Sequence, residues 1–139
     1  MATVEPILCK AGFALFVAGL LLGAAIPRLK SPRLGLSAHL TAVQGGIALI
    51  AIGLLWPHFN LGPMTSTVLC FALWISTWLL SLGIALAAVY GASKVLPIAG
   101  HGLRASAKQE QAVAILVVGS SAVLTLSSIV IFALWIGGR

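Results

Sequence analysis

Long apolar stretches separated by short polar connections follow one another along the chain. Four of them, roughly residues 7–26, 38–57, 66–92 and 111–136, contain almost no charged side chain. A helix rises about 1.5 Å per residue, so about 20 apolar residues cross the roughly 30 Å of hydrocarbon in a bilayer. Backbone N–H and C=O groups at that depth must pair with one another, which a helix achieves within one segment. The pattern therefore predicts an all-α integral membrane protein, a four-transmembrane-helix bundle in a single domain over residues 1–139.

The composition agrees with this interpretation. Apolar residues make up 60% of the 139 residues and charged residues only 7%, whereas soluble domains have about 25% charged residues. The net charge is +6, but the basic residues stand in small groups between apolar runs and form no continuous basic face. We therefore expect membrane lipid, and no nucleic acid, around this chain. The first apolar run lacks a basic start, so we interpret it as a mature helix and not as a signal peptide.

The basic residues also predict an orientation. Six of them fall in the first and third connections, which an even number of spans places on the same side: Arg28, Lys30, Arg33, Lys94, Arg104 and Lys108. Positive loops stay in the cytoplasm. We expect a bacterial inner-membrane protein with its basic loops cytoplasmic.

Polar side chains within or beside the apolar runs are the candidates for chemistry, because burying them in lipid is costly. His39 stands near the start of the second run, and Ser37 is a candidate N-cap that would place His39 in the first helical turn. A neutral imidazole there can bind a metal or haem iron, carry a proton, or simply reach headgroup water. Gln44, Gly45 and Gly46 follow, and the two glycines leave room for a flat ligand or for another helix.

Two further groups of polar residues stand within or beside the predicted spans. Thr77 and Ser81 lie one turn apart on the third helix, where such hydroxyls usually bond to the carbonyl one turn back. His101 and Glu110 stand near the entry to the fourth helix. Glu110 is explained by the helix macrodipole, but His39, His101 and Glu110 would form a site if they converged at the helix ends.

Small and aromatic residues predict helix contacts. Gly19 and Gly23 form a GxxxG pattern on the first helix, which indicates a tight helix contact within or between subunits. Trp74 and Trp78, one turn apart on the third helix, would line an aromatic pocket or face lipid and core.

One segment resembles a known family. Residues 31–40 read SPRLGLSAHL, and the run they open closes with Leu54, Leu55, Trp56 and Pro57. This is similar to the hydroxylaminobenzene mutase family, in which a PRLGLSAHL-like segment leads into a second helix that closes with LxWP. The later segment 96–110, with its GHG and final Gln-Glu, also resembles that family. More distantly, the layout resembles styrene oxide isomerase, another small four-helix membrane enzyme.

The resemblance implies an isomerase that converts an aryl hydroxylamine (hydroxylaminobenzene) to an ortho-aminophenol by intramolecular oxygen transfer. By analogy with styrene oxide isomerase, haem b would be held by His39 as the metal ligand, beside Gly45, with ferric iron as a Lewis acid. The other candidate catalytic side chains are Gln44, Thr77, His101 and Glu110. The implied partners are a small aromatic substrate and further copies of the chain, a homotrimer in that relative.

The chain departs from the family pattern at two positions. The pattern has an asparagine six residues after the histidine, where this chain has Gly45 beside Gln44, and another midway along the third helix, where this chain has Thr77. Either Gln44 and Thr77 substitute, or the register differs by one residue, or this member acts on a different substrate.

Two other classes compete with the isomerase. A small cation-coupled transporter normally needs a carboxylate inside a span, and none of the four apolar runs has one at its middle. An accessory membrane subunit, whose helices only pack against a partner, would tolerate the loss of His39.

Overall fold

The computed structural model describes residues 4–137, which form helices and their connections and contain no β-strand. The first three spans and the two 3-10 turns after the first and second are α1 (Val4–Ala25), η1 (Ile26–Arg28), α2 (Pro32–Leu55), η2 (Trp56–Phe59) and α3 (Pro63–Tyr90). The fourth span is α4 (Ala107–Ala114), the π-helical segment η3 (Ile115–Gly119) and α5 (Ser120–Gly137). Four helical segments are long and apolar enough to cross a membrane, which confirms the predicted fold class.

The start of α2 differs from the prediction. The helix begins at Pro32, and its N-cap is Ser31, whose hydroxyl accepts the Leu34 N–H at 3.3 Å; Ser37 lies inside the helix. Proline suits the first helical position because its missing N–H would have no partner there. His39 therefore lies two turns inside α2, about 10 Å from the helix start.

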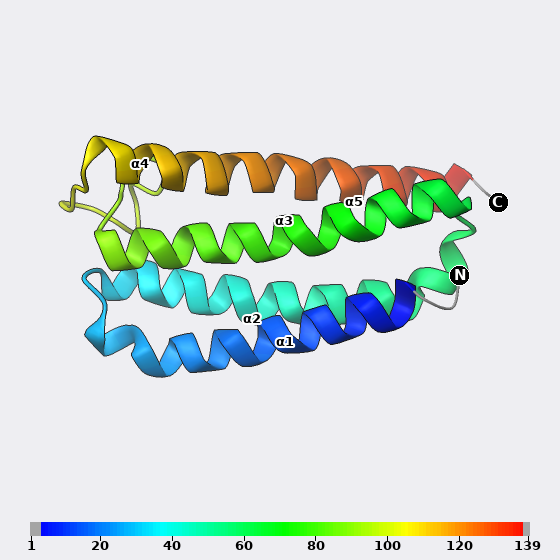
Figure 1. The fold of residues 1–139 in the computed structure, drawn as a ribbon, viewed down its shortest axis with the longest axis horizontal. Helices are drawn as coiled ribbons and strands as arrows, with labels where there is room; N and C mark the ends of the chain where they lie inside the picture. The colour runs from blue at the N-terminus through cyan, green and yellow to red at the C-terminus, as the bar shows by residue number, and fades with distance from the viewer. Residues whose placement is uncertain (1–3, 138–139) are drawn as a thin grey trace.

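The spans lie side by side in the order α1, α2, α3 and then the fourth span, and α1 and α5 do not touch (Figure 1). The α1–α2 and α3–α4 connections meet at one end of the molecule, while η2 and the beginning of α1 lie at the other (Figure 1). The first connection is fastened to the end of α3: Lys30 Nζ donates to the Tyr90 carbonyl at 2.9 Å, and the Ser31 N–H donates to the Ala88 carbonyl at 3.1 Å.

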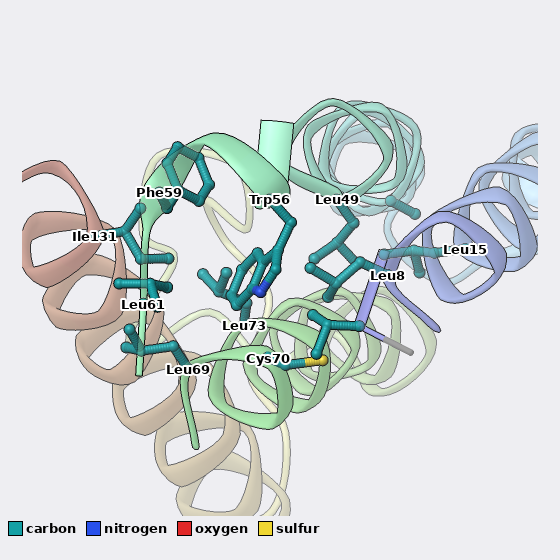
Figure 2. Packing of buried hydrophobic residues seen from close by; sticks show 12 residues of the cluster. Leu8, Leu15, Leu49, Trp56, Phe59, Leu61, Leu69, Cys70, Leu73 and Ile131 are labelled. Carbon is teal, nitrogen blue, oxygen red and sulfur yellow. The ribbon is translucent and has the colours of Figure 1, made fainter. Parts of the chain in front are cut away.

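Two apolar clusters hold the helices together, one near each end. Figure 2 shows the cluster at the η2 end, with the Trp56 ring among residues of α1, α2, α3 and α5. The Trp56 indole N–H donates to the Ser66 hydroxyl at 2.8 Å, so the ring has its polar partner inside the cluster. The second cluster joins the other ends of α2, α3 and the fourth span through Leu34, Ala38, Ile84, Ala87, Ala88, Ala92, Val113 and Val117.

Hydroxyl groups within the spans bond to backbone carbonyls. Thr77 donates to Leu73 O at 2.7 Å and Ser81 donates to Thr77 O at 2.9 Å, as the sequence predicts. In the fourth span, the Ser120 hydroxyl donates to the carbonyls of Leu116 and Val117, in the π-helical segment. In lipid such bonds replace the water that a soluble protein would use.

Candidate functional site

His39 is bonded to helix α1. Its half-buried ring faces α1, and Nδ1 lies 2.7 Å from the carbonyl oxygen of Gly19. A carbonyl oxygen only accepts hydrogen bonds, so Nδ1 must carry the hydrogen. In the neutral ring the lone pair is then on Nε2.

The other ring nitrogen is not fully enclosed by the protein. Nε2 has no hydrogen-bond partner within residues 4–137. Every buried side-chain nitrogen or oxygen atom in this part of the chain does have a partner, so Nε2 is not buried. Nε2 of His39 is therefore accessible at the surface of the α1–α2 pair. The site presents one imidazole lone pair to whatever covers this surface.

Helix α1 makes room for the ring with its two glycines. A Cβ atom added at Gly23 would lie 2.7 Å from His39 Nδ1 and 3.0 Å from Cε1. A Cβ atom at Gly19 would lie 2.9 Å from Val43, one turn along α2. The predicted GxxxG contact is thus made within one chain, and its partner is the histidine helix.

The polar candidates that follow His39 lie elsewhere. Gln44 is exposed on the outer surface of α2. Gly45 meets α3, where an added Cβ atom would lie 2.7 Å from Thr77 Cγ2. Thr77 is 3% exposed, and its hydroxyl is used by the Leu73 carbonyl. Helix α3 therefore fills the space beside Gly45, where the sequence left open a flat ligand or another helix.

His101 and Glu110 do not join His39. His101 is exposed in the α3–α4 connection, and the backbone of α4, which carries Glu110, does not approach that of α2. Within residues 4–137 no three His, Cys, Asp or Glu side chains form a group that could hold a metal ion. The hypothesis that the three residues converge is therefore wrong for a single chain.

Glu110 instead organises the connection before it. Its carboxylate accepts the backbone N–H groups of Ser93 at 3.1 Å, Lys94 at 3.0 Å and Ala105 at 3.2 Å. Three such bonds stabilise the ionised carboxylate. The connection is folded around this side chain. The helix macrodipole explains a glutamate at a helix start, but it does not explain these three bonds to the preceding connection.

Comparison with known proteins decides the family. The family model described as styrene oxide isomerase matches residues 5–137. The chain belongs to the styrene oxide isomerase family. Hydroxylaminobenzene mutase HabB of Ectopseudomonas oleovorans is 38% identical over 135 residues, covering 94% of this chain and 78% of the relative. Hydroxylaminobenzene mutase HabA of the same organism is 35% identical over 113 residues, covering 81% and 84%. No solved structure matches significantly.

Membership of the styrene oxide isomerase family makes this chain a membrane isomerase, and it confirms the resemblance seen in the residues around His39. A single imidazole with an accessible lone pair is a poor site for a bare metal ion, which needs several protein ligands. It does suit haem, whose porphyrin supplies four nitrogens, so that the protein adds only an axial ligand. His39 would therefore be the residue that holds the iron of a bound haem, through its Nε2.

Two apolar grooves lie elsewhere on this family member. One, of about 220 Å³, lies between α1 and α3, and its lining includes Trp78, Ser81 and Ala42. The Trp78 indole N–H donates to the Ala11 carbonyl at 3.2 Å, which fixes that ring against α1. The other, of about 430 Å³, lies between α3 and the π-helical segment. His39 lines neither groove.

Sequence reasoning missed the role of Gly19 and Gly23 toward His39. The GxxxG signal was visible, but it predicts only a close helix contact. The acceptor is a backbone carbonyl 20 residues away, which no side chain marks. Only the fold reveals that the contact is made by the histidine ring.

Proposed function

We propose that this isomerase rearranges an aryl hydroxylamine to an ortho-aminophenol, with ferric haem b held by His39. The observation that carries the proposal is the bond from His39 Nδ1 to the Gly19 carbonyl, which leaves the Nε2 lone pair accessible. The curated relatives that support the substrate class are both named hydroxylaminobenzene mutases. The relevant PRLGLSAHL segment is in place at the start of α2.

The reaction needs no oxidant or reductant. The N–O bond breaks, a C–O bond forms at the ortho carbon, the ring loses one proton there and nitrogen gains one. Substrate and product are therefore isomers. When bound, the haem supplies ferric iron as a Lewis acid for the substrate oxygen.

The residues of this chain contribute position, electron donation and exclusion of water. His39 Nε2 donates its lone pair, and the Gly19 carbonyl holds the ring and raises the basicity of Nε2 through the Nδ1 hydrogen bond. Exposed apolar side chains stand close by along both helices: Leu36 and Leu40 within one turn of His39 on α2, and Leu20 next to Gly19 on α1. An apolar site protects an electron-poor aryl nitrogen from bulk water while oxygen returns to the ring.

The same proposal includes further copies of the chain. A flat macrocycle bound to Nε2 would extend beyond the α1–α2 surface, because His39 is only half-buried in the single chain. A second copy would cover that face and exclude lipid from it. We therefore propose a homo-oligomer in the bacterial inner membrane, with the basic connections in the cytoplasm.

An activity assay tests the substrate class. Membranes that contain the full chain are incubated anaerobically with phenylhydroxylamine, and 2-aminophenol is followed by chromatography against an empty-vector control. We expect wild-type protein to form product and His39→Ala to lose at least about 100-fold of the activity at equal protein level, because second-shell losses alone cost 10–100-fold. His58→Ala and His101→Ala, at exposed positions in η2 and in the α3–α4 connection, are the matched controls and should keep the activity.

The alternatives give different results. Product that persists in His39→Ala would support the isomerase activity and refute the proposal that His39 holds the haem iron. Styrene oxide, included as a second substrate, would point to epoxide isomerisation if only its carbonyl isomer formed. No product from either substrate by well-inserted protein would contradict the proposal and favour the transporter or accessory subunit.

A further inference from the structure

Helix α1 meets His39 with two glycines that are one turn apart. We propose that Gly19 and Gly23 are positioning residues for His39: the Gly19 carbonyl selects the ring nitrogen that carries hydrogen, and Gly23 provides the space in which the ring can reach that carbonyl. The inference deepens the proposed function, on which it rests for the identity of Nε2 as the iron-binding atom.

The Gly19 carbonyl oxygen can accept two hydrogen bonds. In an α-helix this oxygen accepts the N–H of the residue four positions on, which is Gly23. A carbonyl oxygen has a second lone pair, and His39 Nδ1 uses it at 2.7 Å. Only the tautomer with hydrogen on Nδ1 can make this bond, so the helix backbone keeps the Nε2 lone pair available.

The absence of a side chain at Gly23 leaves space for the His39 ring. An added Cβ atom there would lie 2.7 Å from Nδ1 and 3.0 Å from Cε1, closer than side-chain carbons approach ring atoms. The ring cannot move away from such an atom and also keep its bond to Gly19. We therefore expect Gly23→Ala to break the hydrogen bond between His39 Nδ1 and the Gly19 carbonyl, because the new methyl group occupies the space of the ring.

Gly12 provides a matched control on the same pair of helices. An added Cβ atom there would lie 2.6 Å from the Gly46 carbonyl oxygen and 2.9 Å from Ile50 Cγ1, so Gly12→Ala strains the α1–α2 contact at least as much as Gly23→Ala does. None of the atoms nearest to that position belongs to His39. An effect of Gly23→Ala that Gly12→Ala does not share is therefore an effect on the histidine, not on packing.

The first readout is the tautomer, measured without haem or substrate. The full chain is labelled with ¹⁵N-histidine in cells starved of haem precursor, placed in lipid nanodiscs, and studied by NMR above the pH at which histidine is protonated. The His39 signal is identified by its loss in His39→Ala. We expect hydrogen on Nδ1 in the wild type and in Gly12→Ala, and a shift of about 2- to 10-fold toward hydrogen on Nε2 in Gly23→Ala, because the loss of one neutral hydrogen bond changes the tautomer ratio by about that factor.

The second readout is haem binding by the same nanodiscs, followed by absorption and electron paramagnetic resonance of the ferric form. We expect Gly23→Ala to bind haem about 10–100-fold more weakly than the wild type, as for other lost second-shell partners. Gly12→Ala should bind within about threefold of the wild type, since its change is remote from the ring.

The outcomes separate the two proposals. Wild-type His39 with hydrogen on Nε2 would overturn the positioning role without any variant, even if Gly23→Ala did not fold. An equal tautomer shift in Gly12→Ala and Gly23→Ala would overturn it as well. The expected tautomers in a protein that never binds haem would leave the positioning role standing and remove the proposed cofactor.

Discussion

Gly45 and Thr77 meet where α2 packs on α3, and their contact is specific enough to test. The Thr77 hydroxyl is held by the Leu73 carbonyl at 2.7 Å, and its methyl carbon lies 2.7 Å from the position that a Gly45 Cβ would take. We predict that Gly45→Ala lowers the free energy of unfolding by about 1–3 kcal/mol, as overpacking does. Unfolding of purified protein by SDS in mixed micelles measures this change.

The control for this prediction is Thr77→Ser, which removes the methyl group and keeps the hydroxyl. In the double variant Gly45→Ala/Thr77→Ser we expect most of the lost stability to return, with a coupling energy above about 0.5 kcal/mol. An equal cost of Gly45→Ala in both backgrounds would place the strain elsewhere. Loss of activity in Gly45→Ala at full stability would revive the sequence hypothesis that Gly45 lines the cofactor.

His39 shows what a sequence can and cannot predict about one residue. Its residue type, its position near the beginning of an apolar run and its resemblance to a family segment were enough to single it out as the metal-ligand candidate. Its hydrogen-bond partner was not predictable, because a backbone carbonyl looks alike at every position and the two residues are 20 positions apart. The same holds for Glu110, whose three partners are all backbone N–H groups.

At the scale of elements, the apolar runs predicted the number of spans and most of their extent. The boundaries were less predictable, because capping residues compete: both Ser31 and Ser37 are chemically suited to cap α2, and the proline after Ser31 decides for it. The π-helical segment Ile115–Gly119 has no apolar or polar pattern that separates it from the helix around it. The π-helix is defined by the backbone hydrogen bonds of the folded span, which leave no mark on the sequence.

The α3–α4 connection depends on one side chain, which leads to a prediction at this scale. Glu110→Gln replaces one carboxylate oxygen by an NH₂ group that faces N–H donors, so at least one of the three bonds is lost. A hydrogen bond to a charged group contributes about 1.5–3 kcal/mol. We predict that hydrogen exchange of the amides of Ser93, Lys94 and Ala105 speeds up by about tenfold or more, measured by mass spectrometry in nanodiscs.

Glu5→Gln, at the opposite end of the molecule, is the matched control and should leave these amides unchanged. We also expect Glu110→Gln to keep isomerase activity, because the Glu110 carboxylate bonds to the backbone of the connection before α4, and the backbone of α4 does not approach that of the helix that carries His39. If the wild type instead showed proton- or cation-dependent uptake and Glu110→Gln abolished that uptake, Glu110 would have the coupling role of a transporter carboxylate.

At the scale of the whole molecule, charge is distributed unequally between the two ends. The end formed by the α1–α2 and α3–α4 connections carries the six cations in and beside these segments: Arg28, Lys30, Arg33, Lys94, Arg104 and Lys108. The η2 end has neutral residues around Asn60 and Gly62, and Lys10 lies two turns inside α1. Figure 1 confirms that the two basic connections share one end, as the even number of spans predicts.

This asymmetry predicts which end faces the cytoplasm, because short loops rich in Lys and Arg stay on that side. In a Cys9→Ala/Cys70→Ala background, His101→Cys places a thiol at the basic end and His58→Cys places one in η2, and both positions are exposed. With a membrane-impermeant maleimide we expect His58→Cys to react in spheroplasts and His101→Cys to react only after the membrane is opened. The reverse pattern would show that the basic connections are translocated. The half-buried His39 lies two turns from the basic end, so the result also decides from which side of the membrane its site is reached.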